Sequence, residues 1–223
     1  MKIKILIIGI IFIGLFSFIP TKYEIYAKKA NKTTNSFHDI SQKDNIVFLG
    51  DSITDWYPIS DIYNNLPIVK SGVAGYETDD ILERMDTMVY QYNPTKVFLL
   101  IGTNDLKNDD DKTEKTSKKI IKILKQIHKH RPNARLYYEA IFPVNRSLSG
   151  AEDRYNDEIK EVNKIVKEYC VKQNITYIDT YRLLEDSDGN FNKSYTNDGL
   201  HPNELGYSRI SSELLKYIYD IED

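Results

Sequence analysis

A serine, a glycine and an asparagine follow apolar runs in three separated segments of this 223-residue chain, and a histidine lies in a fourth segment, just before the last helical pattern. Ser52 lies in FLGDSIT, Gly75 in GVAGYET, Asn104 in IGTND and His201 in DGLHPN. Each segment alone is an ordinary turn sequence, because glycine, asparagine, aspartate and serine are common turn residues. Together they contain the groups that an acyl-transfer site requires, namely a hydroxyl nucleophile, a base and donors for an oxyanion.

A serine hydroxyl is a weak nucleophile that needs a base, and histidine suits this role because its unperturbed pKa is about 6.5. Three of the four histidines lie in a polar segment or near the end of a basic helical pattern: His38, His128 and His130. His201 alone lies in a loop between an expected strand and an expected helix. Asp198, three residues earlier, can accept a hydrogen bond from the Nδ1–H of His201 and so direct Nε2 toward Ser52.

The oxygen of a tetrahedral intermediate needs hydrogen-bond donors. The candidates are the backbone N–H groups of Ser52 and Gly75 and the side-chain amide of Asn104. Glycine allows close approach to its backbone, and a neutral amide donates without shifting the pKa of the base. Trp56 and Tyr76 follow two of the segments and are candidate walls of a substrate pocket.

Short apolar runs alternate with longer helical patterns along the chain. We expect strands over 46–49, 67–73, 96–101, 135–142 and 175–179, and helices over 78–89, 113–130, 152–172 and 202–218. Thr78 is expected to cap the first of these helices and Pro202 to open the last. Uniformly apolar strands predict a parallel sheet covered by helices on both faces, with ligands bound beyond the carboxyl ends of the strands.

In its four segments the chain resembles the SGNH hydrolases, also called GDSL-type esterases, which are named for serine, glycine, asparagine and histidine in separated blocks. The matching residues are Ser52, Gly75, Asn104 and His201, with Asp198 completing a Ser-His-Asp triad. The first block reads GDSI where the family name has GDSL. The resemblance implies a flavodoxin-like three-layer α/β/α sandwich, with a five-stranded parallel sheet in the order 2-1-3-4-5 that places Ser52 beside Asn104.

The resemblance also implies a reaction, the hydrolysis of carboxylic esters without a metal or a cofactor. Substrates of the family range over acetylated sugars, lysophospholipids and acyl thioesters. We expect short acyl groups such as O-acetyl esters of carbohydrate, because no long apolar insertion suggests a lid for an acyl chain. A lysophospholipase or thioesterase acting on lipids is the alternative enzyme, and a non-catalytic envelope binding module on the same fold is the alternative from another class.

The N-terminus predicts export. Lys2 and Lys4 precede an apolar run over 5–16, which is typical of a signal peptide, and an uncleaved membrane anchor is the alternative. We therefore divide the chain into this segment (1–27), a polar linker (28–44) and an SGNH hydrolase domain (45–223).

The formal net charge of −3 and the lack of a basic stripe make nucleic acid an unsuitable partner. The expected partner is a small-molecule or polysaccharide ester, met outside the cytoplasm, as in a bacterial envelope. Membrane contact is expected only through an uncleaved N-terminal segment. The single cysteine, Cys170, is expected to be a buried core residue.

Overall fold

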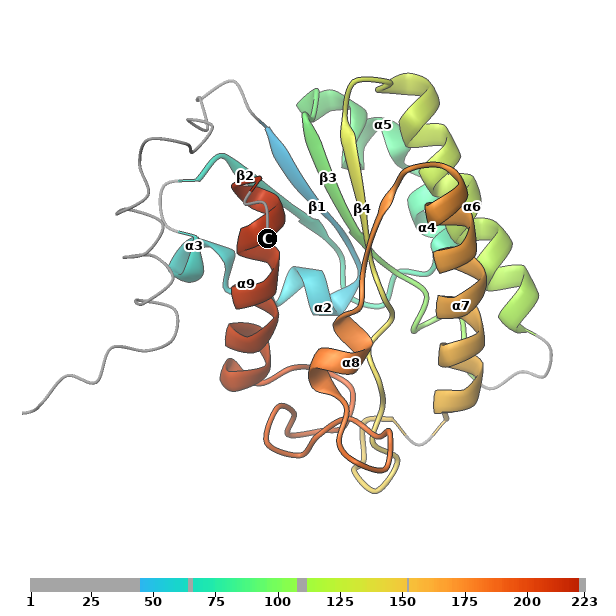
Figure 1. Ribbon diagram of the computed structural model, residues 1–223, viewed down its shortest axis with the longest axis vertical. Coiled ribbons are helices and arrows are strands. Elements are labelled where there is room, and N and C mark those ends of the chain that lie inside the picture. Colours follow the sequence, from blue (N-terminus) through green and yellow to red (C-terminus); the bar gives the residue numbers. More distant parts are fainter. Residues whose placement is uncertain (1–44, 64–65, 108–111, 152, 221–223) are drawn as a thin grey trace, which may run out of the picture.

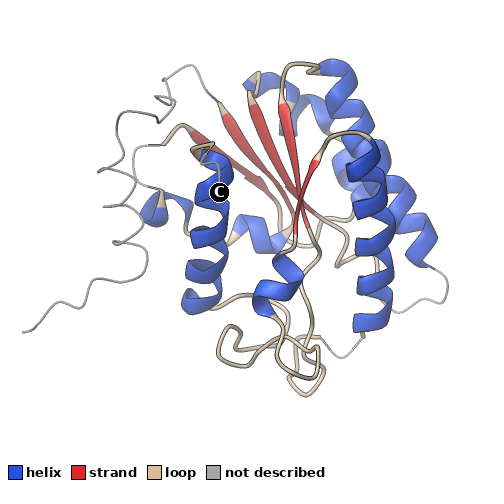
Figure 2. Cartoon of the chain, in the orientation of Figure 1, coloured by secondary structure: helices blue, strands red, loops and turns tan. Residues whose placement is uncertain are grey.

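Five short strands form one sheet in the computed structural model, which describes residues 45–63, 66–107, 112–151 and 153–220. The strands are β1 (Ile46–Gly50), β2 (Ile68–Gly72), β3 (Lys96–Leu100), β4 (Arg135–Glu139) and β5 (Thr176–Ile178). All neighbouring pairs are parallel, and the order is β2-β1-β3-β4-β5, which confirms the predicted fold (Figure 2). The predicted signal peptide or anchor (1–27) and linker (28–44) lie outside the described residues and stay predictions.

Helices cover both faces of the sheet, so that the chain forms three layers (Figure 1). One face packs against α4 (Thr78–Glu83), α5 (Met85–Met88), α6 (Lys112–His130) and α7 (Asn156–Lys172). The other packs against α2 (Ser52–Asp55), α3 (Ile59–Ile62), α8 (Thr180–Leu184) and α9 (Glu204–Ile218). A short 3₁₀ helix, η1 (Tyr90–Tyr92), precedes β3. None of the helices in the described part of the chain is both long and apolar enough to cross a bilayer.

The two cores explain why β1 is apolar throughout. Val47 and Leu49 point into the core that α4 to α7 cover, whereas Ile46 and Phe48 point into the core on the α9 side. Side chains alternate between the faces of a strand, and a strand buried on both faces therefore has no polar position. Cys170 is buried in α7, as predicted.

The expected helix over 78–89 is two helices, α4 and α5, which are separated at Arg84. Its N-cap is Glu77 and not Thr78, because the Glu77 and Asp80 side chains and backbone N–H groups form a reciprocal capping box. Thr78 instead donates both its N–H and its hydroxyl to Asp105, in the loop after β3. The polar residue expected to cap the helix is thus used in a tertiary contact.

Two other helix starts were predicted too early. The last helix begins at Glu204 and not at Pro202, since the Asn203 side chain accepts a hydrogen bond from the N–H of Gly206 and caps it there. Pro202 is held outside the helix in an isolated bridge with Thr196. The helix expected from residue 152 begins at Asn156. Both segments before these helices belong to the loops that build the site.

Candidate active site

The first segment places Ser52 at the start of α2, directly after β1. Asp51 caps this short helix, with its Oδ1 accepting a hydrogen bond of 2.9 Å from the N–H of Ile53. Gly50, the last residue of β1, leaves no room for a side chain, because a Cβ there would lie 2.3 Å from the carbonyl oxygen of Leu100 on β3. Ser52 thus lies at the carboxyl edge of the sheet, two residues beyond the end of β1. It is 7% exposed.

Ser52, His201 and Asp198 form a hydrogen-bonded series. The Ser52 hydroxyl lies 2.9 Å from Nε2 of His201, and Nδ1 of His201 lies 2.7 Å from Oδ2 of Asp198. The other oxygen of Asp198 accepts the N–H groups of Leu200 and His201, each at 2.8 Å. Burial raises the pKa of Asp198, but the hydrogen bonds from His201 and Leu200 outweigh burial and hold this pKa below its usual value.

The loop that carries Asp198 and His201 rests on the segment that follows β4. The N–H of Asn145 donates to the carbonyl of Gly199, and the N–H of Gly150 donates to the carbonyl of Asp198, both at 2.8 Å. Gly199 has a φ of +86°, and a Cβ on it would lie 2.3 Å from the carbonyl oxygen of Asn145. Only glycine fits both this backbone conformation and this close contact.

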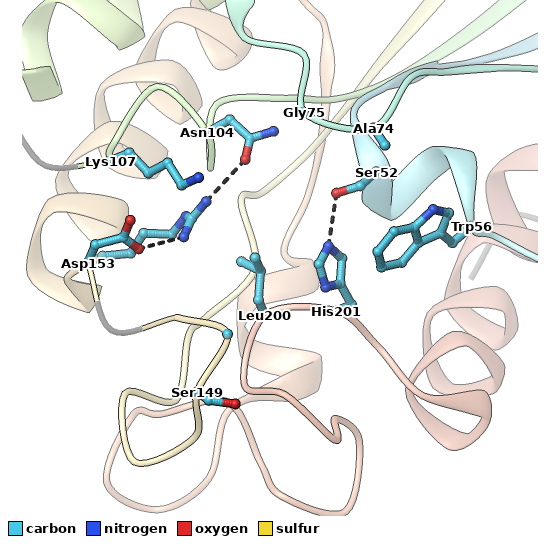
Figure 3. A pocket seen from close by; sticks show the side chains of 12 residues that line it. Ser52, Trp56, Ala74, Gly75, Asn104, Lys107, Ser149, Asp153, Leu200 and His201 are labelled. Carbon is cyan, nitrogen blue, oxygen red and sulfur yellow. Dashed lines mark hydrogen bonds and ion pairs between the residues drawn. The ribbon is translucent and has the colours of Figure 1, made fainter.

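The predicted oxyanion donors lie around one cavity, which has a volume of about 450 Å³ and is shown in Figure 3. Ser52, Gly75 and Asn104 line it together with His201 and Trp56. No described residue accepts a hydrogen bond from the N–H of Gly75, which has a φ of +83° in the turn after β2. The Ser52 N–H stands in the first turn of α2, where no intrahelical acceptor exists. Both backbone groups can therefore serve a ligand.

The two aromatic candidates differ in position. Trp56 lines the cavity, is 54% exposed, and has its ring centroid 4.2 Å from that of His201. Tyr76 is not among the described residues that line the cavity, and its ring lies under the guanidinium of Arg84, 5.3 Å from it. Tyr76 contributes through its backbone, because its carbonyl accepts a hydrogen bond of 3.0 Å from Nδ2 of Asn104.

Arg154 is a residue of the site that sequence reasoning missed. It is 2% exposed, it lines the cavity, and its guanidinium donates to Asn104, Thr103 and Asp153. In the sequence it stands in the polar stretch AEDRYN, at the start of the helix expected over 152–172. Nothing in that local pattern marks it as buried, because its partners are remote in the chain.

Two aspartates next to the site are also buried. Asp105 accepts hydrogen bonds from the N–H and the hydroxyl of Thr78 and so joins the loop after β3 to the start of α4. Asp51 is 1% exposed, and its Oδ2 makes no hydrogen bond to a described residue. Burial raises the pKa of Asp51 to about 7. Within the described ranges, no group of three or more His, Cys, Asp or Glu side chains could hold a metal ion.

The model of the GDSL-like lipase/acylhydrolase family matches residues 48–209 of this chain. Among curated proteins, the N-acylneuraminate cytidylyltransferase of Escherichia coli O18:K1:H7 is 28% identical over 198 residues, which are 88% of this chain and 45% of that protein. The chain spans less than half the length of the curated relatives it matches. The cytidylyltransferase name therefore describes a much longer protein.

Solved structures share the fold. A Streptococcus pneumonia protein, provisionally described as a platelet activating factor, superposes with a TM-score of 0.73 at 29% identity, over 88% of this chain and 92% of that chain. An acetylxylan esterase from Geobacillus stearothermophilus superposes with a TM-score of 0.61 at 18% identity, over 78% of this chain and 94% of that chain. At such low identity the second similarity concerns the fold alone.

Proposed function

Because this chain belongs to the GDSL-like lipase/acylhydrolase family, and hence to the serine ester hydrolases, we propose that it hydrolyses short acyl esters of carbohydrates with Ser52 as its nucleophile. The observation that carries the proposal is the series from Ser52 through His201 to Asp198, with contacts of 2.9 and 2.7 Å. Nucleophile, base and orienting carboxylate stand in the arrangement that serine hydrolysis requires.

In the proposed reaction, Nε2 of His201 takes the proton of Ser52 as its oxygen attacks the ester carbonyl. Asp198 holds the imidazole by Nδ1 and stabilises the positive charge that forms on it. His201 then returns the proton to the leaving alcohol and the acyl-enzyme forms. A water molecule, activated by the same imidazole, attacks this acyl-enzyme and releases the acid.

The proposed oxyanion hole consists of the N–H groups of Ser52 and Gly75 and Nδ2 of Asn104. These donors are fixed before the substrate binds, so that little reorganisation is needed as negative charge develops. Loss of one such donor typically lowers the rate by about 10²–10³-fold.

The cavity supports a short acyl group on a polar alcohol. Its described lining includes three apolar side chains, those of Trp56, Ala74 and Leu200, beside polar and charged groups. A long acyl chain would need a larger apolar surface, whereas the exposed Trp56 ring offers a face on which a sugar can pack. The name of one curated relative, a multidomain esterase of Ruminococcus flavefaciens, supports an ester as the substrate.

Labelling with a fluorophosphonate tests the nucleophile. We expect one label per chain on Ser52 in the native protein, no label on Ser52→Ala, and unchanged labelling of Ser149→Ala, a serine that lines the same cavity outside the series. Equal labelling of native and heat-denatured protein, or none in either, would instead indicate a non-catalytic binding module.

A comparison of ester substrates, with the wild type and Ser52→Ala, tests the length of the acyl group. p-Nitrophenyl acetate should be hydrolysed faster than the octanoate, and acetate should be released from acetylated xylan, in both cases only with Ser52 present. Faster turnover of the octanoate would contradict the short-acyl proposal and favour a lipid esterase.

A further inference from the structure

Arg154 is buried beside the proposed oxyanion hole and makes three hydrogen bonds there. Its Nε donates to the carbonyl of Thr103 at 2.9 Å, its Nη2 to Oδ1 of Asn104 at 3.1 Å, and its Nη1 to Oδ1 of Asp153 at 2.7 Å. A buried charge is costly unless it is paired and hydrogen-bonded. Here two of the three acceptors belong to consecutive residues of the segment that supplies Asn104, so this buried charge is directed at one segment of the site.

The Asn104 amide lies between two partners that differ in hydrogen-bonding character. A guanidinium can only donate, and the side-chain oxygen of Asn104 faces that of Arg154. A backbone carbonyl can only accept, and Nδ2 of Asn104 donates to that of Tyr76 at 3.0 Å. If the amide were flipped, its NH₂ group would face the guanidinium of Arg154 and its oxygen would face the carbonyl of Tyr76, and neither pair could form a hydrogen bond. These two partners therefore specify one orientation of the Asn104 amide. Nδ2 carries a second hydrogen, which this orientation leaves for a ligand.

We propose that Arg154 is the positioning residue of the oxyanion hole, which locks the Asn104 amide with its nitrogen toward the reacting carbonyl. Its positive charge also polarises this amide, which strengthens the N–H as a donor when the oxyanion forms. In Figure 3 the Asn104 side chain lies across the cavity from Ser52, with its nitrogen turned toward Ser52. Its oxygen accepts the hydrogen bond from Nη2 of Arg154. The inference rests on the proposed function, because it assigns a task to Arg154 only if Asn104 binds an oxyanion.

Replacement of Arg154 should act on turnover more than on substrate binding. We expect Arg154→Met to lower kcat for p-nitrophenyl acetate by about 10²-fold, as for loss of one oxyanion donor, with KM changed less than about threefold. Arg154→Lys keeps a charge without the planar fork and should fall between this variant and the wild type. Arg182→Met, an exposed arginine on α8, is the matched control and should leave both constants unchanged.

A double-mutant cycle with Asn104→Ala separates positioning from general stability. If Arg154 acts through Asn104, Arg154→Met should cause little further loss of kcat in the Asn104→Ala background. The inference would be overturned if the two substitutions lowered kcat by factors that multiply in the double variant. It would also be overturned if the kcat of Arg154→Met were close to that of the wild type. Should the methionine variant not fold, Arg154→Lys takes its place in the cycle with the same criterion. A wild-type protein without Ser52 labelling or ester turnover would overturn the proposed function as well, whereas failure of the cycle alone leaves that function intact.

Discussion

His201 can act as a base toward Ser52 only in the tautomer that leaves Nε2 without a proton. Asp198 selects this tautomer, because its Oδ2 accepts the Nδ1–H at 2.7 Å. The two backbone N–H groups on its other oxygen fix the carboxylate in turn. At the scale of single residues, the direction of each hydrogen bond thus decides which chemistry the site can support.

Asp198→Asn tests this point with little change of shape. An asparagine can present its NH₂ group to Nδ1 and so favour the tautomer whose Nε2 carries the proton, which cannot activate Ser52. We expect kcat for p-nitrophenyl acetate to fall by about 10⁴-fold while the free energy of unfolding changes little. Asp188→Asn, in an exposed loop, is the control. A loss below about tenfold would show that Asp198 does not orient the base.

Among the structural elements, the loops position the side chains that the strands alone do not bring together. The strands carry Ser52 and Asn104 to one edge of the sheet, but the Asp198 and His201 loop reaches that edge only because the segment after β4 supports it. The contact between Gly199 and Asn145 is a backbone-to-backbone approach, which no side-chain movement can relieve.

Gly199→Ala should therefore destabilise the protein and disturb the site. The left-handed conformation alone costs about 1–2 kcal/mol for a residue other than glycine. The collision with the Asn145 carbonyl adds to this cost, and moving the loop would lengthen the contact from Ser52 to His201.

The matched control is Gly189→Ala, because Gly189 also has a positive φ, but its nearest contact would be Nζ of Lys160, the mobile end of a side chain. Urea denaturation should show a larger loss of unfolding free energy for Gly199→Ala, and only this variant should lose most of its kcat. Equal effects of the two substitutions would contradict a supporting role for the contact.

At the scale of the whole molecule, two cores enclose the sheet and bury carboxyl groups with it. Glu139 at the end of β4 is 4% exposed, and burial raises its pKa from 4.5 to about 8. Between pH 4.5 and about pH 8, Glu139 keeps its proton in the folded protein but has released it in the unfolded chain. Stability therefore falls as the pH rises through this window. The raised pKa of Asp51, about 7, acts in the same sense.

Glu139→Gln removes one of these titrations. We expect its free energy of unfolding, measured relative to the wild type by urea denaturation, to increase from pH 5 to pH 8 and then to level off. Glu168→Gln, an exposed glutamate on α7, should show no such trend. A difference that is constant with pH would mean that Glu139 does not titrate across this range.

The sheet, and the edge of it where chemistry is expected, could be predicted from the amino-acid sequence alone. Apolar runs that alternate with helical patterns specify a parallel sheet, and the carboxyl ends of its strands lie at one edge, as Ser52 and Asn104 do here. Short helices such as α2, α3 and α8 were not predicted, because four or five residues are too few to show a helical period.

Other features became visible only in the folded chain: Trp56 lines the cavity while the ring of Tyr76 packs under Arg84, Asn203 caps α9, and Arg154 is buried against Asn104. A polar side chain is buried where hydrogen-bond partners satisfy it, and Arg154 and its partner Asn104 are 50 residues apart in the chain. Local patterns specify strands and turns, whereas such pairings exist only once the sheet has brought remote segments together.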